Sequence, residues 1–509
     1  MKQKTLILSL FIILKFLLQY FLINPDYELH RDEFLHLDQA NHLAWGYQSV
    51  PPVTSWISYI IKLLGNSLFW IKFFPALFGA LTLFIVWKTI EELNGNLFAL
   101  CLGATCVLFS ALLKLNFYYQ PTSLDVLTWT ALYFVLVKYF KSKQLVWLFA
   151  GSLVFAIGFL NKYAIVFLVI GIFPALIITK QRSIFNKASL YFAVMLAIAL
   201  VLPNLIWQYH NNFPVFHHLN ELATTQLVNI NRWEFLKQQV FYNGGSLLVI
   251  MAGLYALLFF EPFKNYRFLF WSLFFTLFVF TYFRAKGYYA LGLYPIYIAF
   301  GSVFIGNMWN SGLKKYLKPV AVAIPVLFYL LFLDVFFTNE SPRHVLENQD
   351  AYKRIGMLRW EDGKDHQLPQ DFADMLGWRE LAKKVDAAYS KLPNKVETLV
   401  ICDNYGQAGA INYYTTIKNL QAVSFNADYI NWFDLAVPKM NLIRVKDSIG
   451  SKTELAETSP FFSTALVADS ITNPLAREYQ TTIFIFTNPK IDINRRLEEE
   501  LDRKKSFKK

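Results

Sequence analysis

The sequence predicts a polytopic α-helical membrane protein with a smaller α/β domain at its C-terminal end. Of its 509 residues, 55% are hydrophobic and only 17% are charged, and its mean hydropathy of +0.34 is unusual for a soluble domain. Apolar runs of about 17–25 residues recur, each long enough to cross about 30 Å of hydrocarbon. The runs are continuous and do not alternate with polar residues, which excludes a transmembrane β-barrel.

The first apolar run follows the basic residues Lys2 and Lys4 and is not followed by a small-residue cleavage site, so it is interpreted as an uncleaved signal anchor. The segment 52–64 is too short to span and is expected to lie at the interface or to re-enter the membrane. About eleven spans are expected, near residues 6–23, 69–90, 97–114, 122–138, 145–160, 163–179, 188–207, 240–260, 267–283, 288–306 and 318–337.

The distribution of lysine and arginine predicts the orientation of these spans. Basic loops near 138–143, 180–187, 264–267 and 314–318 fall on one side, together with the N-terminus, and positive loops face the cytoplasm. The other loops, near 24–52, 208–239 and 284–289, and the C-terminal third are then expected outside the cytoplasm. The same loops account for the net charge of +12, and since no basic run sits on a recognisable binding module, no nucleic-acid partner is expected.

Three acidic residues near span ends are candidates for function. Asp32 and Glu33 adjoin each other in the outward loop after the first span; the alternative is a solvated loop with helix caps. Asp125 begins the fourth span. An ionisable group near a span suggests function, but a carboxylate also favours the first turn of any helix.

Cations on the outward side form the second candidate group. Arg284 and Lys286 oppose the positive-inside pattern, which indicates an anionic ligand; the alternative is that they reach lipid head groups. Lys162 separates two apolar runs at an outer turn and is either a second phosphate contact or a plain turn residue.

The sequence gives little support for a metal site or for a disulfide. His217 and His218 would bind a metal only if carboxylates such as Glu221 joined them in space. The three cysteines give neither a zinc spacing nor a disulfide framework. No metal ligand and no certain cofactor is assigned, and a divalent metal is left open.

The composition shifts past residue 337, which divides the chain into a transmembrane domain, 1–339, and an outer α/β domain, 340–509. In the second domain, a helix is expected over 371–392 and strands over 397–402, 464–468 and 481–486. The turn containing Gly406 and Gly409 is a weak phosphate-cradle signal. It lacks a Walker lysine and the first glycine of a dinucleotide fingerprint, so a structural turn is favoured.

Five stretches together resemble the bacterial members of glycosyltransferase family 39, named after the dolichyl-phosphate-mannose–protein mannosyltransferases, and more distantly the lipid A aminoarabinose transferases. The resemblance covers roughly residues 1–310. No single motif is specific, but the order and spacing of the five are. The stretches are Arg31-Asp32-Glu33, Trp45-Gly46-Tyr47 with Val50-Pro51-Pro52, Phe74 to Ala80, Leu202 to Gln208, and Lys286 to Pro295.

The resemblance implies the GT-C fold and a sugar donor linked to a lipid phosphate. It implies that Asp32, with Glu33 beside it, is catalytic, and that Asp125 is a second acid. The basic motif before the tenth span is associated with the donor phosphate, which implies this role for Lys286 and Arg284. Lys162, Tyr288 and Tyr289 are added to this predicted donor-binding group, and for the two tyrosines the favoured alternative is an aromatic belt at the membrane interface.

The chemistry of such a transfer suits these residue types. The leaving phosphate needs cations, and a carboxylate can take the proton of the attacking hydroxyl. A single carboxylate without a second nucleophile predicts inversion at the sugar carbon. The predicted function is transfer of a hexosyl or pentosyl group from a polyprenyl-phosphate donor to an envelope lipid, glycan or protein, at the outer face of the bacterial inner membrane. The alternatives are a transporter of lipid-linked sugars and a non-catalytic scaffold.

Overall fold

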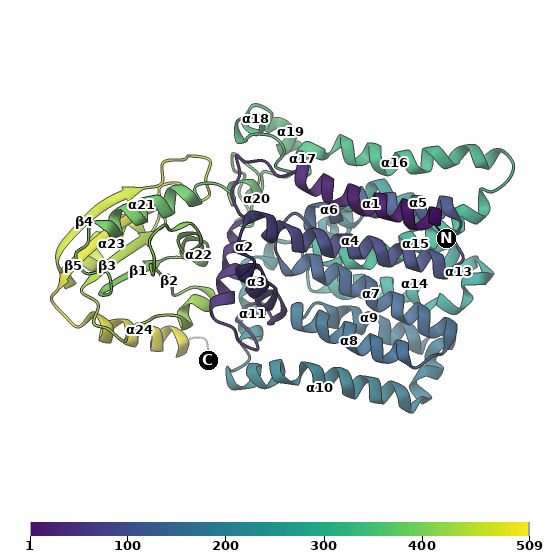
Figure 1. Cartoon of the computed structure of the whole chain (residues 1–509), viewed down its shortest axis with the longest axis horizontal. Helices are drawn as coiled ribbons and strands as arrows, with labels where there is room; N and C mark the ends of the chain where they lie inside the picture. Colours follow the sequence, from purple (N-terminus) through teal and green to yellow (C-terminus); the bar gives the residue numbers. More distant parts are fainter. Residues whose placement is uncertain (1, 507–509) are drawn as a thin grey trace.

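The structure is a computed structural model that describes residues 2–506. It contains a bundle of long helices and, beyond one end of the bundle, an α/β domain built around a five-stranded sheet (Figure 1). Three short helices lie between the two parts: α2 (Arg31–Asp38), α3 (Val53–Leu63) and α11 (Pro214–Thr225). The predicted combination of a helical membrane part and a C-terminal α/β domain is confirmed.

A helix is found in every segment predicted to span. These helices are α1 (Lys2–Phe21), α4 (Leu68–Glu92), α5 (Leu97–Leu108), α7 (Pro121–Ser142), α8 (Val146–Asn161), α9 (Ile165–Ile177), α10 (Ala188–His210), α13 (Leu247–Phe259), α14 (Phe268–Tyr282), α15 (Tyr294–Met308) and α16 (Lys318–Leu331). Within residues 2–506, five helices are long and apolar enough to cross a membrane, or up to seven if each bent pair counts as one span. The chain is thus a multi-pass membrane protein, while the number eleven stays a prediction.

The centre of the bundle is formed by α15, which packs against α13, α5 and α4. Small residues allow this close packing, because a Cβ atom on Gly301 would lie 1.8 Å from the carbonyl oxygen of Val249. In the most apolar part of the segment Gly287–Met308, 89% of the residues are buried. The corresponding fractions for α1 and α10 are only 17% and 22%. The outer helices therefore present their apolar surfaces outward, as helices in contact with lipid do.

The segment too short to span forms α3, an 11-residue helix. Its buried face carries Thr54, Ser55 and Ser58, and its exposed face carries apolar residues such as Ile60 and Leu63. It packs beside α2 at the end of the bundle nearest the α/β domain (Figure 1). The prediction of a non-spanning helix is consistent with this arrangement.

The loops predicted to face outward lie together. The region of α2 and α11 and the α/β domain are all at one end of the bundle, and the N-terminus is at the opposite end (Figure 1). Lys286, in the third of these loops, pairs with Glu361 of the α/β domain. The 3₁₀ segment η6 (Gly287–Leu293) that follows packs against α12 (Arg232–Tyr242) and α7.

The α/β domain has the strand order β2-β1-β3-β5-β4. Strands β1 (Thr398–Cys402), β2 (Ala422–Ser424) and β3 (Asn441–Lys446) are parallel, and β5 (Thr482–Pro489) pairs antiparallel with β3 and with β4 (Phe462–Ser470). One face is covered by α21 (Trp378–Ser390) and α22 (Tyr405–Tyr414), the other by α24 (Ile493–Ser506).

The single helix predicted over 371–392 is wrong in one respect. The structure has a short helix α20 (Gln370–Ala373) and then α21, with Gly377 between them at φ +86°. This left-handed conformation favours glycine and interrupts the helix. The remaining short helices are α6 (Ala111–Leu115), α17 (Leu333–Phe336), α18 (Pro342–Glu347), α19 (Gln349–Arg354) and α23 (Ser451–Thr458).

The two parts share a hydrophobic cluster. Phe34 and Phe117 of the bundle side belong to the same buried cluster as Trp378 of the α/β domain. At the closest approach of α2 and α22, a Cβ atom on Gly409 would lie 2.7 Å from the Cβ of Phe34. Gly406 and Gly409 lie inside α22 and not in the turn predicted for them, and Gly409 lets this helix contact α2.

Candidate functional site

Helix α2 holds the two adjacent acids through its first turn. The ring of His30 caps the helix, because its Nδ1 accepts a hydrogen bond from the backbone N–H of Asp32 at 3.2 Å. Glu33 completes the capping box by accepting from the backbone N–H of His30 at 2.8 Å. The cap fixes the two carboxylates in different directions.

Glu33 points into the protein and is 0% exposed. Its carboxylate lies 2.7 Å from Nζ of Lys72 on α4, and it also accepts from the backbone N–H of Tyr119 at 2.7 Å. Together with the bond from His30, these contacts join α2, α4 and the 117–120 segment. The acid predicted to be catalytic beside Asp32 therefore lies in a buried ion pair without access for a substrate.

Asp32 points outward, with 37% of its side chain exposed. The hydroxyl of Tyr405 donates to its Oδ1 at 2.6 Å, and the amide of Gln120 donates to its Oδ2 at 3.1 Å. One of these donors comes from the bundle and the other from the α/β domain. The predicted catalytic aspartate is thus accessible and held by both parts of the protein.

The surroundings of Asp32 keep its carboxyl ionised. Partial burial alone would raise the pKa, but His30 when it is protonated, the charge of Arg31 and the hydrogen bond from Tyr405 lower it to about 2. Arg31 lies with its guanidinium carbon 4.6 Å from the centre of the Tyr405 ring. Asp32 is consequently a fixed negative charge at neutral pH.

Residues of the α/β domain also contact His30 and Arg31, which flank Asp32. The backbone carbonyl oxygen of Asp374 accepts from the backbone N–H of Arg31 at 3.2 Å, and the carboxylate of Asp374 lies 3.6 Å from Nε2 of His30. Arg477 in turn lies 3.0 Å from Asp374. Sequence analysis did not identify these contacts, since Asp374 is far along the chain from His30, Arg31 and Arg477.

The predicted phosphate-binding cations lie at the same end of the bundle. Nζ of Lys286 is 2.5 Å from the carboxylate of Glu361, and Arg284 donates to the carbonyl oxygen of Val228 at 3.1 Å. Burial would lower the pKa of Lys286, but Tyr289, Glu361 and Asp32 raise it above its usual value. Lys286 therefore stays positively charged, and its partner Glu361 belongs to the α/β domain, which also holds Asp32 through Tyr405.

Lys162 contacts both tyrosines of the predicted donor-binding group. Its Nζ lies 4.4 Å from the ring centre of Tyr289 and 5.7 Å from that of Tyr288, as in cation–π contacts. It is also 3.5 Å from Oγ1 of Thr122 at the start of α7. Asp125 follows Thr122 by three positions on the same helix, so the two residues share a face.

Asp125 is 3% exposed, and its Oδ1 has no hydrogen-bond partner among the described residues. A buried carboxylate oxygen in this state is costly unless a ligand or a nearby cation compensates it. Lys162 supplies a nearby charge that acts on this carboxylate. Asp125 therefore belongs with Lys162, Tyr288 and Tyr289, and it is more buried than Asp32.

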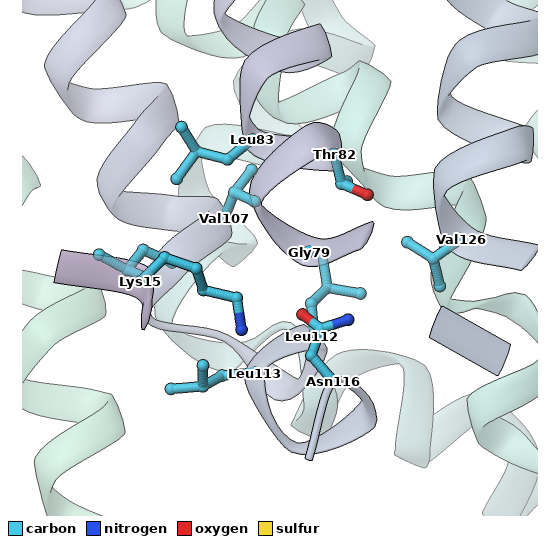
Figure 2. A pocket seen from close by; sticks show the side chains of 10 residues that line it. Lys15, Gly79, Thr82, Leu83, Val107, Leu112, Leu113, Asn116 and Val126 are labelled. Carbon is cyan, nitrogen blue, oxygen red and sulfur yellow. The ribbon is translucent and has the colours of Figure 1, made fainter. Parts of the chain in front are cut away.

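A second lysine, not singled out from the sequence, is buried in the bundle. Lys15 of α1 is 3% exposed, and its Nζ donates to Gln19 at 2.6 Å. It points into a small cavity beside Gly79 and Asn116 (Figure 2). The cavity has about 10 Å³ of free space, close to what one water needs, and so cannot hold a sugar or phosphate.

No metal site can be assigned from the geometry. Between residues 2 and 506, no group of three or more histidine, cysteine, aspartate or glutamate side chains is placed to hold a metal ion. His217 and Glu221 lie on α11, whose residues are all at least partly exposed.

Comparisons with known proteins agree with this architecture. Residues 49–207 match the family described as dolichyl-phosphate-mannose-protein mannosyltransferase. The lipid A galacturonosyltransferase RgtD of Rhizobium johnstonii is 26% identical over 206 residues, which make up 38% of this chain and 43% of that protein. The matched region thus spans less than half of the relative. The family match includes Asp125 and Lys162 but ends before Lys286 and begins after Asp32.

The fold is similar to that of ArnT from Cupriavidus metallidurans. The crystal structure of ArnT bound to undecaprenyl phosphate gives a TM-score of 0.60 at 12% sequence identity, covering 94% of this chain and 97% of that chain. The apo structure gives the same TM-score at 13% identity. The similarity therefore extends over both the helical bundle and the C-terminal domain.

Proposed function

We propose that this chain, a member of the GT-C glycosyltransferase superfamily, transfers a sugar from a polyprenyl-phosphate donor to an acceptor in the cell envelope. The observation that carries the proposal is an accessible, ionised Asp32 bonded to Gln120, directly before the start of α7, where Thr122 contacts Lys162 beside Tyr289. A lipid-linked donor keeps its tail in the bilayer and its head group at that end. The names of the matched family and of RgtD support sugar transfer and give no support to the transporter alternative.

The cations are suited to the phosphate of the donor. Lys286, Arg284 and Lys162 can stabilise the negative charge that develops on the departing oxygen. Lys286 is paired with Glu361, so a phosphate binding there would replace that carboxylate as its partner. Tyr288 and Tyr289 position Lys162 and line the same region.

Asp32 is suited to accept the proton of the acceptor hydroxyl. A bond forms between the acceptor oxygen and the anomeric carbon as the bond from that carbon to the phosphate oxygen breaks, and the configuration inverts. Because the Asp32 carboxyl has a pKa of about 2, it does not retain the proton. The proton passes to water or to the departing phosphate monoester, whose second pKa is about 6.

The other two acids take supporting roles. Glu33 fixes α2 through its pair with Lys72, and so orients Asp32 from within the protein. Asp125 lies beside Lys162 and can hold that cation in place or receive a polar group of the substrate.

We place the chain in the bacterial inner membrane, with the N-terminus in the cytoplasm and residues 340–509 as a periplasmic domain. The support is that the N-terminus lies at the opposite end of the bundle from α2 and the α/β domain (Figure 1). The positive loops predicted from the sequence follow the same division.

The test compares cells that express the wild type, no protein, or Asp32→Asn. We expect mass spectrometry of envelope lipids, glycans and proteins to show one sugar that is present only with the wild type. The purified wild type should also release polyprenyl phosphate from a polyprenyl-phosphate sugar when an acceptor is added. An envelope change without donor consumption by the purified protein would favour transport, and no change in any envelope fraction would overturn both.

A further inference from the structure

We propose that Tyr405 of the α/β domain is a positioning residue for Asp32, so that the C-terminal domain forms part of the sugar-transfer site. The hydroxyl of Tyr405 would hold the carboxylate of Asp32 in one orientation. This inference rests on the proposed function, because it assumes that Asp32 acts on the acceptor hydroxyl.

The contact has the geometry of a strong hydrogen bond. The distance of 2.6 Å from the Tyr405 hydroxyl to Oδ1 of Asp32 is typical of a hydroxyl donating to a charged oxygen. Gln120 holds the second oxygen at 3.1 Å. Since a carboxylate offers about four lone-pair sites, each oxygen keeps one for a substrate. The two donors thus restrict the orientation of Asp32 without blocking it.

Three local features fix the position of Tyr405. It is the first residue of α22, and the side chain of Asn404 caps this helix by accepting from the N–H of Gln407 at 3.0 Å. Gly409 lets the helix approach α2 closely. Arg31 covers the ring of Tyr405, so the ring is held on one side while its hydroxyl reaches Asp32.

The hydroxyl is not needed to fold α2. The cap of that helix is complete with His30 and Glu33, and Glu33 is anchored by Lys72. The Tyr405 hydroxyl instead bonds to the one acid of the pair that is accessible. Its effect is therefore expected on the charge and orientation of Asp32 and not on the assembly of the helices.

The experiment uses full-length Tyr405→Phe, which keeps the ring and its contact with Arg31. We expect kcat to fall about tenfold to a hundredfold, the range expected for loss of one hydrogen bond to a charged group. The KM for a polyprenyl-phosphate sugar should change less than twofold. The pH at which kcat falls on the acidic side should rise toward about 4, the ordinary pKa of an aspartate carboxyl.

The matched control is Tyr413→Phe. Tyr413 lies on the same helix and its hydroxyl also crosses the domain interface, donating to the carbonyl oxygen of Asn66 at 3.1 Å. This variant should keep the wild-type pH profile and kcat. Replacing Tyr405 with 3,5-difluorotyrosine retains the ring and hydroxyl and provides a test should Tyr405→Phe fail to fold. The stronger donor should move the acidic limb downward.

The two proposals fail in different ways. If Asp32→Asn keeps wild-type turnover, the proposed role of Asp32 is wrong, whatever Tyr405 does. If Asp32→Asn abolishes transfer while Tyr405→Phe keeps the wild-type kcat and acidic limb, only the positioning role is overturned. A kcat above that of the wild type in Tyr405→Phe would also overturn it, because the hydroxyl would then restrain the reaction.

Discussion

Lys286 and Glu361 form an ion pair of 2.5 Å across 75 positions of sequence, between the basic loop before α15 and the N-terminal part of the α/β domain. Glu361 also accepts from the side chain of Gln370 at 3.3 Å, and its carbonyl oxygen accepts from Asn229 at 3.3 Å. The cation predicted to bind the donor phosphate is therefore already neutralised by an acid that is 41% exposed. An anionic donor must compete with that acid.

We expect Glu361→Gln to lower the KM for the polyprenyl-phosphate donor about two- to fivefold, since an exposed ion pair contributes about 0–1 kcal/mol. Lys286→Ala should raise the same KM about tenfold or more and change the acceptor KM little. Steady-state kinetics with each substrate varied in turn measure both effects. Equal donor KM values in Lys286→Ala and the wild type would remove the phosphate role of Lys286.

Replacing Asp32 tests the proton acceptor directly. Asp32→Asn keeps the shape of the side chain but removes its charge, and we expect turnover to fall about 10²–10⁴-fold, the usual contribution of a general base. Asp26→Asn is the control, because Asp26 is an exposed acid of the same loop. Thermal unfolding in detergent should be unchanged in Asp26→Asn. Asp32→Asn should unfold at a somewhat lower temperature, because it loses the contacts of the ionised carboxylate, so turnover is compared at a temperature where both variants are folded. Near-normal turnover in Asp32→Asn would contradict the assignment.

The pH dependence of turnover follows from the same charges. The carboxyl of Asp32, with a pKa of about 2, is ionised throughout the range above its ordinary value of about 4. Any stability that this ionised group contributes is present above that value and is lost as the pH falls toward 2. Lys286 has a raised pKa and stays charged in weakly alkaline solution.

We therefore expect kcat/KM to be flat between about pH 5 and pH 9, because neither group titrates there. Initial rates in overlapping buffers at constant ionic strength measure this. A wild-type rate that falls with an acidic limb near pH 6 would show that another group, and not Asp32, limits the reaction.

Changes to Glu33 and Lys72 are expected to lower the stability of the protein more than they lower its turnover. Removing one partner of a buried ion pair costs about 3–5 kcal/mol, so Lys72→Met should destabilise the protein strongly. The double variant Lys72→Met with Glu33→Gln should recover part of this loss, because no unpaired charge remains. The exposed pair Lys88–Glu91, 2.8 Å apart, is the control and should change stability by less than about 1 kcal/mol. Reversible unfolding in mixed detergent micelles measures the differences.

The sequence predicted local features better than contacts between distant segments. A continuous apolar run is sufficient to specify a helix in the bundle, so a helix forms in each predicted span. Strand β2 was missed because it has only three residues, and β3 (Asn441–Lys446) because its polar residues hide the strand pattern. Gly377 interrupts a helical pattern that is otherwise continuous.

The candidate site shows the same division. Asp32, Lys286 and Lys162 could be singled out because charged residues next to apolar runs are conspicuous. Tyr405 could not, since it is 373 positions from Asp32 and an aromatic residue after a strand is commonly part of a core. Lys72 was hidden inside an expected span, where only its pair with Glu33 gives it a role.

Gly409 offers a test of how far the contact between α2 and α22 controls the site. In Gly409→Ala, the new Cβ would lie 2.6 Å from the hydroxyl of Tyr429 and 2.7 Å from the Cβ of Phe34, so the helices must move apart. We expect a loss of about 1–3 kcal/mol of stability, as for other overpacked positions.

The same displacement should carry Tyr405 away from Asp32 and lower turnover at temperatures where Gly409→Ala is still folded. Gly151→Ala is the control, because its nearest neighbour would be a side-chain atom 3.6 Å away, an ordinary contact. Thermal unfolding and initial rates measured on the same preparations separate the two effects. A Gly409→Ala protein that is destabilised but turns over at the wild-type rate would show that the site tolerates movement of α22.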